Sequence, residues 1–338
     1  MPTVLNGNVM TLTMWTNSLG PDHKVQTRVA NLLAQQNGVV SDASWIMGNL
    51  PMGHQGEVQT GLPPAYYTLM NQFVPVGVDS AMPILEQSAR LEAYTQVDDR
   101  LYKLGGPGEG EKLRARRSKA QLEQFNQTFA KTFFYGSSVN PASFIGLNVR
   151  YGAISGATNG VNVLDAGGRA NTNASIYLVV WGEETCTCFF PSGSKAGIDH
   201  EDLGKVPLQS LSGSDTNPAV KQVWQEHWEW QHGLFLPDWR YIVRIANVDV
   251  PSLLAKTGAD LIDLLIRAYH HVPNINAGRP AIYMNRTLFE MFDIQMRDAV
   301  QKGGQLKMEI VDGILIPVFR GVPIRIVDQL LNTESTVS

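Results

Sequence analysis

The 338-residue sequence lacks most of the features that assign a chemistry to a protein. It holds only two cysteines, and no apolar run approaches the roughly 20 residues that a membrane-spanning helix requires. Its first residues, MPTVLNGNVMTLTMW, have neither the early Lys or Arg nor the clean apolar stretch of a signal peptide. We therefore expect neither a membrane protein nor a secreted one.

The two cysteines do not form a recognisable site. Cys186 and Cys188 lie in ETCTCFF, where an extended chain points both side chains the same way and a bridge between them would be strained. No second Cys pair or Cys/His pair follows at the spacing of a zinc site. We expect both thiols to be reduced, as in a protein that folds in the cytosol.

The sequence also has no excess of positive charge. Its 27 Lys and Arg face 31 Asp and Glu, for a net charge of −4. Because nonspecific nucleic-acid binding depends on Lys and Arg, we expect no tight binding of nucleic acid. The content of 43% hydrophobic and 17% charged residues is that of a folded protein with one elaborate domain or two modest ones.

Catalytic and metal-binding motifs are absent or weak. GGPGEGEK (105–112) lacks the Ser or Thr of a phosphate-binding loop, which favours a hinge. The adjacent His270 and His271 leave a helix in different directions, which favours a polar helix end over a metal pair. The group Asp199–Asp202 suits a solvated turn better than a metal or acid–base site. We predict no enzyme, no catalytic or metal-binding residues and no cofactor.

Residues 51–98 predict an extended hairpin with ragged edges. They hold few helix signals and are interrupted by prolines and glycines, and Tyr67, Leu69 and Phe73 fall on one alternate set. A two-stranded excursion of this length is poorly stable alone. We therefore expect it to lie on a partner.

A long helix is predicted over about 110–135, with Gly136 as its stop. It would be roughly 39 Å long at 1.5 Å per residue. Its first turns are basic and its second half is aromatic, so the two halves should have different surroundings. The basic residues are Arg114, Arg116, Arg117 and Lys119. The apolar face, at helical spacing, consists of Leu122, Phe125, Phe129 and Phe133.

The stretch HWEWQHGLFLPDWRYIVRIANVDV (227–250) is rich in aromatic residues and continues into an apolar run. An extended chain places Trp224, Trp228 and Trp230 on one side. Such alternation is more typical of the packed face of a sheet than of a ligand pocket. The following strand is apolar on both faces apart from Arg244.

The remaining elements complete a mixed pattern. SIYLVVWG (175–182) and CTCFFP predict a strand pair around the turn residues GEET. A short amphipathic helix is predicted within 20–38. Near the other end, helices are predicted over 258–273, after Asp260, and from Asn285 to about 300. Strands are predicted at 281–285 and, as a pair, within 313–328, giving a compact α/β layer.

Several stretches, in order over nearly the whole chain, resemble tailed-phage major capsid proteins of the Hong Kong 97-type fold, in the branch of the epsilon-15-like short-tailed phages. The N-terminal ones are MGNLPMGHQGEVQTGLP (47–63), LEAYTQVDDRLYKL (91–104) and FNQTFAKTFFYGSSVNPASFIGL (125–147). The others are SIYLVVWG with FPSGSKAGIDHEDLG (175–204), DWRYIVRIANVDV (238–250) and PIRIVDQLLNTE (323–334).

The resemblance implies an α+β fold with four parts and a tail. These are an N-terminal arm (1–48), an extended loop (49–106), a peripheral domain (107–250) with a spine helix (109–136), an axial domain (251–330) and a C-terminal tail (331–338). In this family the extended loop lies over a neighbouring subunit. We expect inter-subunit contacts at Tyr66, Tyr67, Leu69, Phe73, Arg114, Arg116 and Arg117.

The resemblance also implies a structural function. Many copies would form hexamers and pentamers that close into an icosahedral shell around double-stranded DNA, without sequence-specific binding. Expected partners are other copies of the chain, a scaffolding protein, a portal protein and a decoration protein. Assembly would take place in the host cytoplasm and the product would be the virion. Some relatives join subunits through a Lys–Asn bond, but neither Lys103 nor Asn285 lies in a matching motif.

Two alternatives remain open from the sequence. An encapsulin-type compartment shares the fold but carries cargo enzymes in place of DNA, and neighbouring genes would distinguish it. A glycan-binding or hydrolytic β protein would use the tryptophan cluster and Asp199–Asp202. Glycan binding that is lost on Trp228→Ala would identify it.

Overall fold

The computed structural model describes residues 35, 37–104, 106–169, 171–209, 220–300, 307–311 and 314–338. The chain divides into two compact units. Of the described residues, unit 1 contains 90–126 and 197–231, and unit 2 contains 35–89, 127–196 and 232–338. The chain passes from one unit to the other within helix α4 (Glu109–Tyr135) and within strand β9 (Val220–Phe235).

Unit 1 is built around the first part of β9. Strand β8 (Asp199–Gln209) pairs with it in antiparallel register, from Asp199 opposite Glu229 to Gln209 opposite Val220. Strand β4 (Ala89–Asp98) also pairs with β9 and leads into helix α3 (Asp99–Leu104). The first turns of α4 complete the unit.

Aromatic packing fixes the inside of unit 1. Trp228 and Trp230 are buried, as expected for the packed face of a sheet. Trp224 is half-buried and stacks on Tyr102, with ring centroids 4.8 Å apart. Gly110 leaves room for the Tyr102 ring, because a Cβ at residue 110 would lie 2.4 Å from that ring. The tryptophans therefore present no open aromatic face of the kind that a sugar ring needs.

Unit 2 is organised around a seven-stranded mixed sheet of order β12-β13-β14-β11-β6-β10-β5. Its central strands are β6 (Asn173–Trp181), buried along its whole length, and β10 (Ile242–Asp249). Alternation alone could not identify such strands, because both of their faces are covered. The other strands are β5 (Val163–Asp165), β11 (Arg279–Met284), β12 (Lys307–Val311), β13 (Ile314–Phe319) and β14 (Val322–Ile326).

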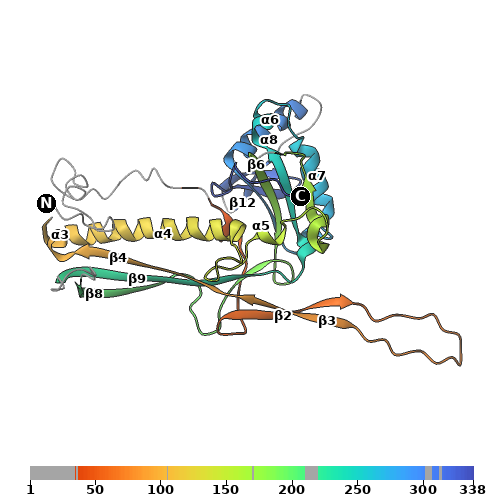
Figure 1. Cartoon of the computed structure of the whole chain (residues 1–338), viewed down its shortest axis with the longest axis horizontal. Coiled ribbons are helices and arrows are strands. Elements are labelled where there is room, and N and C mark those ends of the chain that lie inside the picture. The colour runs from red at the N-terminus through yellow and green to blue at the C-terminus, as the bar shows by residue number, and fades with distance from the viewer. Residues whose placement is uncertain are drawn as a thin grey trace. The chain divides into compact units, whose positions relative to one another are not determined.

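Helices cover both faces of this sheet. Ile176, Leu178 and Val180 of β6 belong to one apolar core with residues of helices α6 (Val250–Leu254), α7 (Leu261–His271) and α8 (Arg286–Val300), which lie beside the sheet in Figure 1. The aromatic end of α4 packs on the opposite face of β6, which carries Tyr177 and Trp181. Phe133 stacks on Trp181 at 5.4 Å and Phe134 lies 5.1 Å from Tyr177.

A second part of unit 2 carries a β-hairpin. Strand β1 (Trp45–Met47) is parallel to β7 (Thr187–Phe190), which pairs with the end of β9. Next, β2 (Gly53–Gly61) and β3 (Ser80–Gln87) form an antiparallel two-stranded sheet of their own. Short helices α2 (Val39–Asp42) and α5 (Leu147–Arg150) complete the regular elements discussed below.

Most of the predicted elements are confirmed. Helix α4 ends at Tyr135, directly before Gly136, and Phe125, Phe129 and Phe133 of its predicted apolar face are buried. Asp260 is the N-cap of α7, and both α8 and the strand pair β13–β14 lie where they were expected. The α+β fold class is confirmed. The helix expected within 20–38 lies almost entirely outside the described residues.

Four details of the sequence prediction are wrong. Strands β6 and β7 belong to different sheets, and the turn between them contains a single isolated bridge, between Gly182 and Cys186. Leu122 is 42% exposed and so does not belong to the buried face of α4. Residues 62–79 form no strand, and Asp199–Asp202 begin strand β8 instead of forming a turn. These errors concern which sheet a strand joins, which side chains are buried and which exposed segments form strands. Such properties depend on tertiary contacts, which the local spacing of residues does not reveal.

Two further observations concern the described residues. Cys186 and Cys188 are free thiols and both are buried. Among the described helices, none combines the length and the apolar character needed to cross a membrane.

The N-cap of α7 provides a test of the fold. The Asp260 carboxylate accepts hydrogen bonds from the amides of Ile262 (3.0 Å) and Asp263 (3.2 Å). We expect Asp260→Ala to lower the free energy of unfolding of unit 2 by about 1 kcal/mol in urea titrations, because two helix amides lose their acceptor. Asp260→Asn keeps an acceptor and should change it little. Equal losses for both variants would contradict this capping role.

Candidate assembly surfaces

The loop that joins β2 to β3 is the most exposed apolar segment of the described chain. All residues from 62 to 79 are exposed except Gly77, which is half-buried. Tyr67 and Phe73 are fully open to solvent. The other exposed apolar residues of this segment, which we call the hairpin tip, are Leu62, Tyr66, Leu69, Met70, Val74, Val76 and Val78. In Figure 1 it is the long loop beyond β2 and β3.

The base of the hairpin, in contrast, is firmly attached. Glu86 of β3 accepts two hydrogen bonds from the Arg150 guanidinium, at 2.6 and 2.7 Å, and both side chains are largely buried. The Asn49 side chain accepts a hydrogen bond from the amide of Gln55 on β2 (2.8 Å) and donates one to its carbonyl (2.7 Å). The bidentate Glu86–Arg150 ion pair fixes the orientation of the two side chains as well as their distance.

Aromatic contacts complete the attachment. The His54 ring meets Phe235 edge-on, with centroids 4.4 Å apart. Gly56, two residues along the same face, leaves room for that ring, since a Cβ would lie 2.4 Å from Phe235. Burial lowers the pKa of His54, whose Nδ1 has no hydrogen-bond partner among the described residues. The neutral ring is therefore the form that fits this site.

A cavity of unit 2 runs along β2 beside this attachment. It has a volume of about 870 Å³ and is lined by β2 and by residues 183–184 and 235–240. Four acidic residues, Glu57, Glu183, Glu184 and Asp238, line it. Among the described residues no group of three or more His, Cys, Asp or Glu is arranged to hold a metal ion.

The three arginines expected at a subunit contact have different environments in unit 1. Arg114 is paired within the chain, to Glu226 (2.7 Å) and Asp202 (2.7 Å). Arg117 donates to the carbonyl of Gln96. Arg116 is half-buried and has no ion pair with a described residue. Burial lowers the pKa of Arg116 and of Arg117.

A polar network at the start of α3 lies close to this region. Asp99 accepts from Lys205 (2.8 Å), Lys103 (2.9 Å) and the indole of Trp224 (3.1 Å). These hydrogen bonds hold the pKa of Asp99 at about 2, below its ordinary value of 3.8. Lys103 is therefore already engaged within its own unit.

Other candidate residues of the sequence have structural positions. His270 and His271 lie in the last turn of α7, and Arg320 from the β13–β14 turn lies 3.3 Å from His270. Asn285 precedes α8 and accepts the amide of Leu288 at 2.8 Å. The Glu86–Arg150 pair was missed by the sequence analysis, since the two residues lie 64 positions apart without a shared pattern.

The described residues of the two units thus contain buried polar networks and a firmly attached hairpin with a bare apolar tip. An exposed apolar segment of this size is typical of a protein that associates through its surface. Comparisons with known proteins agree. A family model, "Major capsid protein GP7", matches residues 20–338. The chain belongs to this family of phage coat proteins, which form the icosahedral shell of the virion.

Solved phage structures resemble the chain to different degrees. The structure of bacteriophage Epsilon15 matches with a TM-score of 0.73 and 26% identity, over 99% of this chain and 99% of that one. The capsid of bacteriophage JBD30 matches with a TM-score of 0.44 and 10% identity, over 90% and 94% of the two chains. No curated protein sequence matches. The expected Hong Kong 97-type fold and coat function are confirmed.

The hairpin attachment can be tested through Glu86. We expect Glu86→Ala to increase amide hydrogen exchange in β2 and β3 by about tenfold or more, because a charged bidentate hydrogen bond contributes roughly 1.5–3 kcal/mol. Glu57→Ala, on the opposite face of the same hairpin, is the matched control and should leave exchange unchanged. Indistinguishable exchange in the two variants would show that the ion pair does not hold the hairpin.

The Asp99 network predicts a dependence of stability on pH. The folded-state pKa is depressed, so the network stabilises the fold above pH 3.8 and this contribution is lost as the pH falls towards about 2. We expect Asp99→Asn to flatten the fall in unfolding free energy between about pH 4 and 2, measured by chemical denaturation. Asp98→Asn, which keeps an acceptor for the backbone amide of Arg100, should retain the wild-type slope. A wild-type slope in Asp99→Asn would exclude this role.

Proposed function

We propose that this coat protein assembles by laying its hairpin tip on a neighbouring copy, so that hexamers and pentamers form and close around double-stranded DNA. The proposal rests on one observation, the bare apolar tip. Nine apolar side chains between residues 62 and 78 are exposed. Soluble monomers rarely expose contiguous apolar surface on this scale, and such a surface marks a site of association.

The rigidity of the hairpin base supports a defined partner site. An apolar segment on a mobile loop would adhere to many surfaces. Here the Glu86–Arg150 ion pair and the contact of His54 with Phe235 fix the position of strands β2 and β3 on the rest of unit 2. The conformational cost of docking is then smaller, because the strands are already ordered before the partner arrives.

Arg116 is the second proposed contact. Unlike Arg114 and Arg117, it makes no hydrogen bond or ion pair with a described residue, although it is half-buried. An acidic side chain of an adjacent copy would compensate its charge. Arg114 and Arg117 are proposed to contribute to the interface chiefly by holding α4 against β9 and β4, through Glu226 and Gln96.

The domain assignment and the other partners are also proposals. We assign 1–48 to an arm, 49–106 to the extended loop, 107–250 to a peripheral domain, 251–330 to an axial domain and 331–338 to a tail. The resemblance to tailed-phage coat proteins supports scaffolding, portal and decoration proteins as further partners, and assembly in the host cytoplasm. No catalytic step is proposed, since the work of a coat protein is done by its interfaces.

The assembly proposal is tested by charging the tip. We expect the double variant Tyr67→Asp, Leu69→Asp to fold normally but to give a particle yield at least about tenfold lower, since 1.4 kcal/mol at a contact is already a factor of ten. Yield is measured by sedimentation and electron microscopy of the protein expressed with its scaffolding protein, and folding by circular dichroism.

The matched control is Val139→Asp, which charges an apolar residue that is 88% exposed outside the hairpin. It should assemble like the wild type. Normal particles from the double variant, or an equal loss from Val139→Asp, would contradict the assignment of the tip as the contact.

A further inference from the structure

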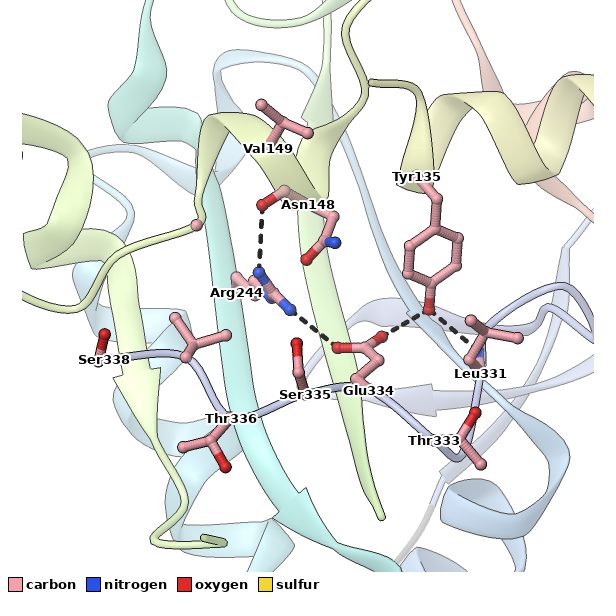
Figure 2. Close-up of a pocket in the computed structure, with 12 residues that line it drawn as sticks. Tyr135, Asn148, Val149, Arg244, Leu331, Thr333, Glu334, Ser335, Thr336 and Ser338 are labelled. Atoms are coloured by element: carbon pink, nitrogen blue, oxygen red, sulfur yellow. Dashed lines mark hydrogen bonds and ion pairs between the residues drawn. The ribbon is translucent and has the colours of Figure 1, made fainter. Parts of the chain in front are cut away.

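The last eight residues, 331–338, lie as an extended segment against unit 2. They contain no helix or strand, and only Glu334 and Val337 are buried. Figure 2 shows the segment passing beneath Arg244 and the end of α4. Its attachment therefore depends on few apolar contacts, unlike that of strand β6, which is buried along its whole length.

The charge of Arg244 is compensated by this segment. Arg244, at the centre of β10, is 1% exposed, and its guanidinium donates to Glu334 at 2.8 Å. Ser175 and Tyr135 donate to the same carboxylate, each at 2.5 Å. Among the described residues Glu334 is the one carboxylate within ion-pair distance of Arg244. A buried guanidinium without it would be strongly unfavourable.

The segment's backbone is hydrogen-bonded at Leu331, Glu334, Val337 and Ser338. Asn173 and Glu334 exchange both of their backbone hydrogen bonds, at 2.8 and 3.3 Å. The Asn247 side chain accepts from the amide of Val337 (2.8 Å) and donates to its carbonyl (2.9 Å). Asn247 has φ +60° and lies at a bulge in β10, so the sheet is locally distorted where it presents this amide.

This combination is how proteins recognise an extended peptide. Backbone pairing supplies affinity in any sequence, and a pocket for one side chain supplies selectivity. Here the pocket is the Arg244–Ser175–Tyr135 group and its ligand is a carboxylate. A cavity of about 400 Å³ lies beside the segment, between it and Asn148, Val149 and Gly152. It leaves room for the segment to move without disturbing the core.

We propose that the groove formed by Tyr135, Ser175, Arg244 and Asn247 is a peptide-binding site whose occupant is residues 331–338 of the same chain, and that this segment leaves and re-enters the groove as a unit while the rest of unit 2 stays folded. The proposal is independent of the assembly proposal. It also links the segment to α4, because the Tyr135 hydroxyl, on the last residue of that helix, contacts Glu334 and the amide of Leu331.

Native-state hydrogen exchange of the full-length protein tests the release. We expect the amides of Glu334 and Val337 to exchange at least about 100-fold faster than those of β6 and β10, and with almost no dependence on low urea concentrations, because little surface is exposed when the segment leaves. Exchange of the segment at the rate and with the urea dependence of the core would overturn the proposal.

A core variant separates local release from global unfolding. Leu265→Ala, in the apolar core between α7 and the sheet, should accelerate core exchange by about tenfold or more and leave the segment unchanged. Glu334→Gln should accelerate the segment by about tenfold, and Ser335→Ala, at an exposed neighbour, should not. Acceleration of the segment in step with the core in Leu265→Ala counts against independent release.

The binding site itself is tested with a fluorescein-labelled peptide, LNTESTVS, added to the full-length Glu334→Gln protein. We expect saturable binding by fluorescence polarisation, and binding about tenfold weaker for LNTQSTVS, since only the glutamate compensates Arg244. Equal affinity of the two peptides, or no binding of either one to the folded variant, would overturn the assignment. The exchange series on the wild type decides the release if this variant fails to fold.

Discussion

Burial of both faces of the strand pair β6–β10 is the constraint on which the rest of unit 2 depends. A sheet with two apolar faces must be covered twice, and the two covers differ in kind. The helices α6, α7 and α8 follow the strands along the chain, whereas the aromatic end of α4 precedes them. The pairs Phe133–Trp181 and Phe134–Tyr177 therefore fix the C-terminal half of α4, and the basic half of the same helix is left to serve unit 1.

A second constraint is that three ion pairs with buried or largely buried partners join residues distant in sequence. Arg244 is completed by Glu334, Arg150 by Glu86, and Arg114 by Glu226. Burial makes each pair costly to break, although an equivalent apolar pair would often be as stable. Such pairs specify one arrangement of the elements, which matters for a protein that must present the same interface in every copy.

The sequence predicted local elements well because periodicity and capping are local. The spacing of Phe125, Phe129 and Phe133 and the stop at Gly136 were enough for α4, and Asp260 was enough for α7. Partners were not predictable. Two apolar strands around a turn look like a hairpin, but β6 and β7 enter different sheets. Arg244 was noticed as the one charge in an apolar strand, yet nothing local identified Glu334, 90 residues away, as its partner. The apolar tip was visible as a pattern, and its exposure was not.

The two buried cysteines have a practical meaning. Burial raises the pKa of Cys186 to about 12 and raises that of Cys188, so at neutral pH neither thiol provides the thiolate that reagents attack. The folded native chain is therefore expected not to react with maleimides or methanethiosulfonates. A single cysteine placed on the tip would be the sole reactive handle among the described residues. Spin labels or fluorophores could then follow the hairpin during particle growth without removal of either native cysteine.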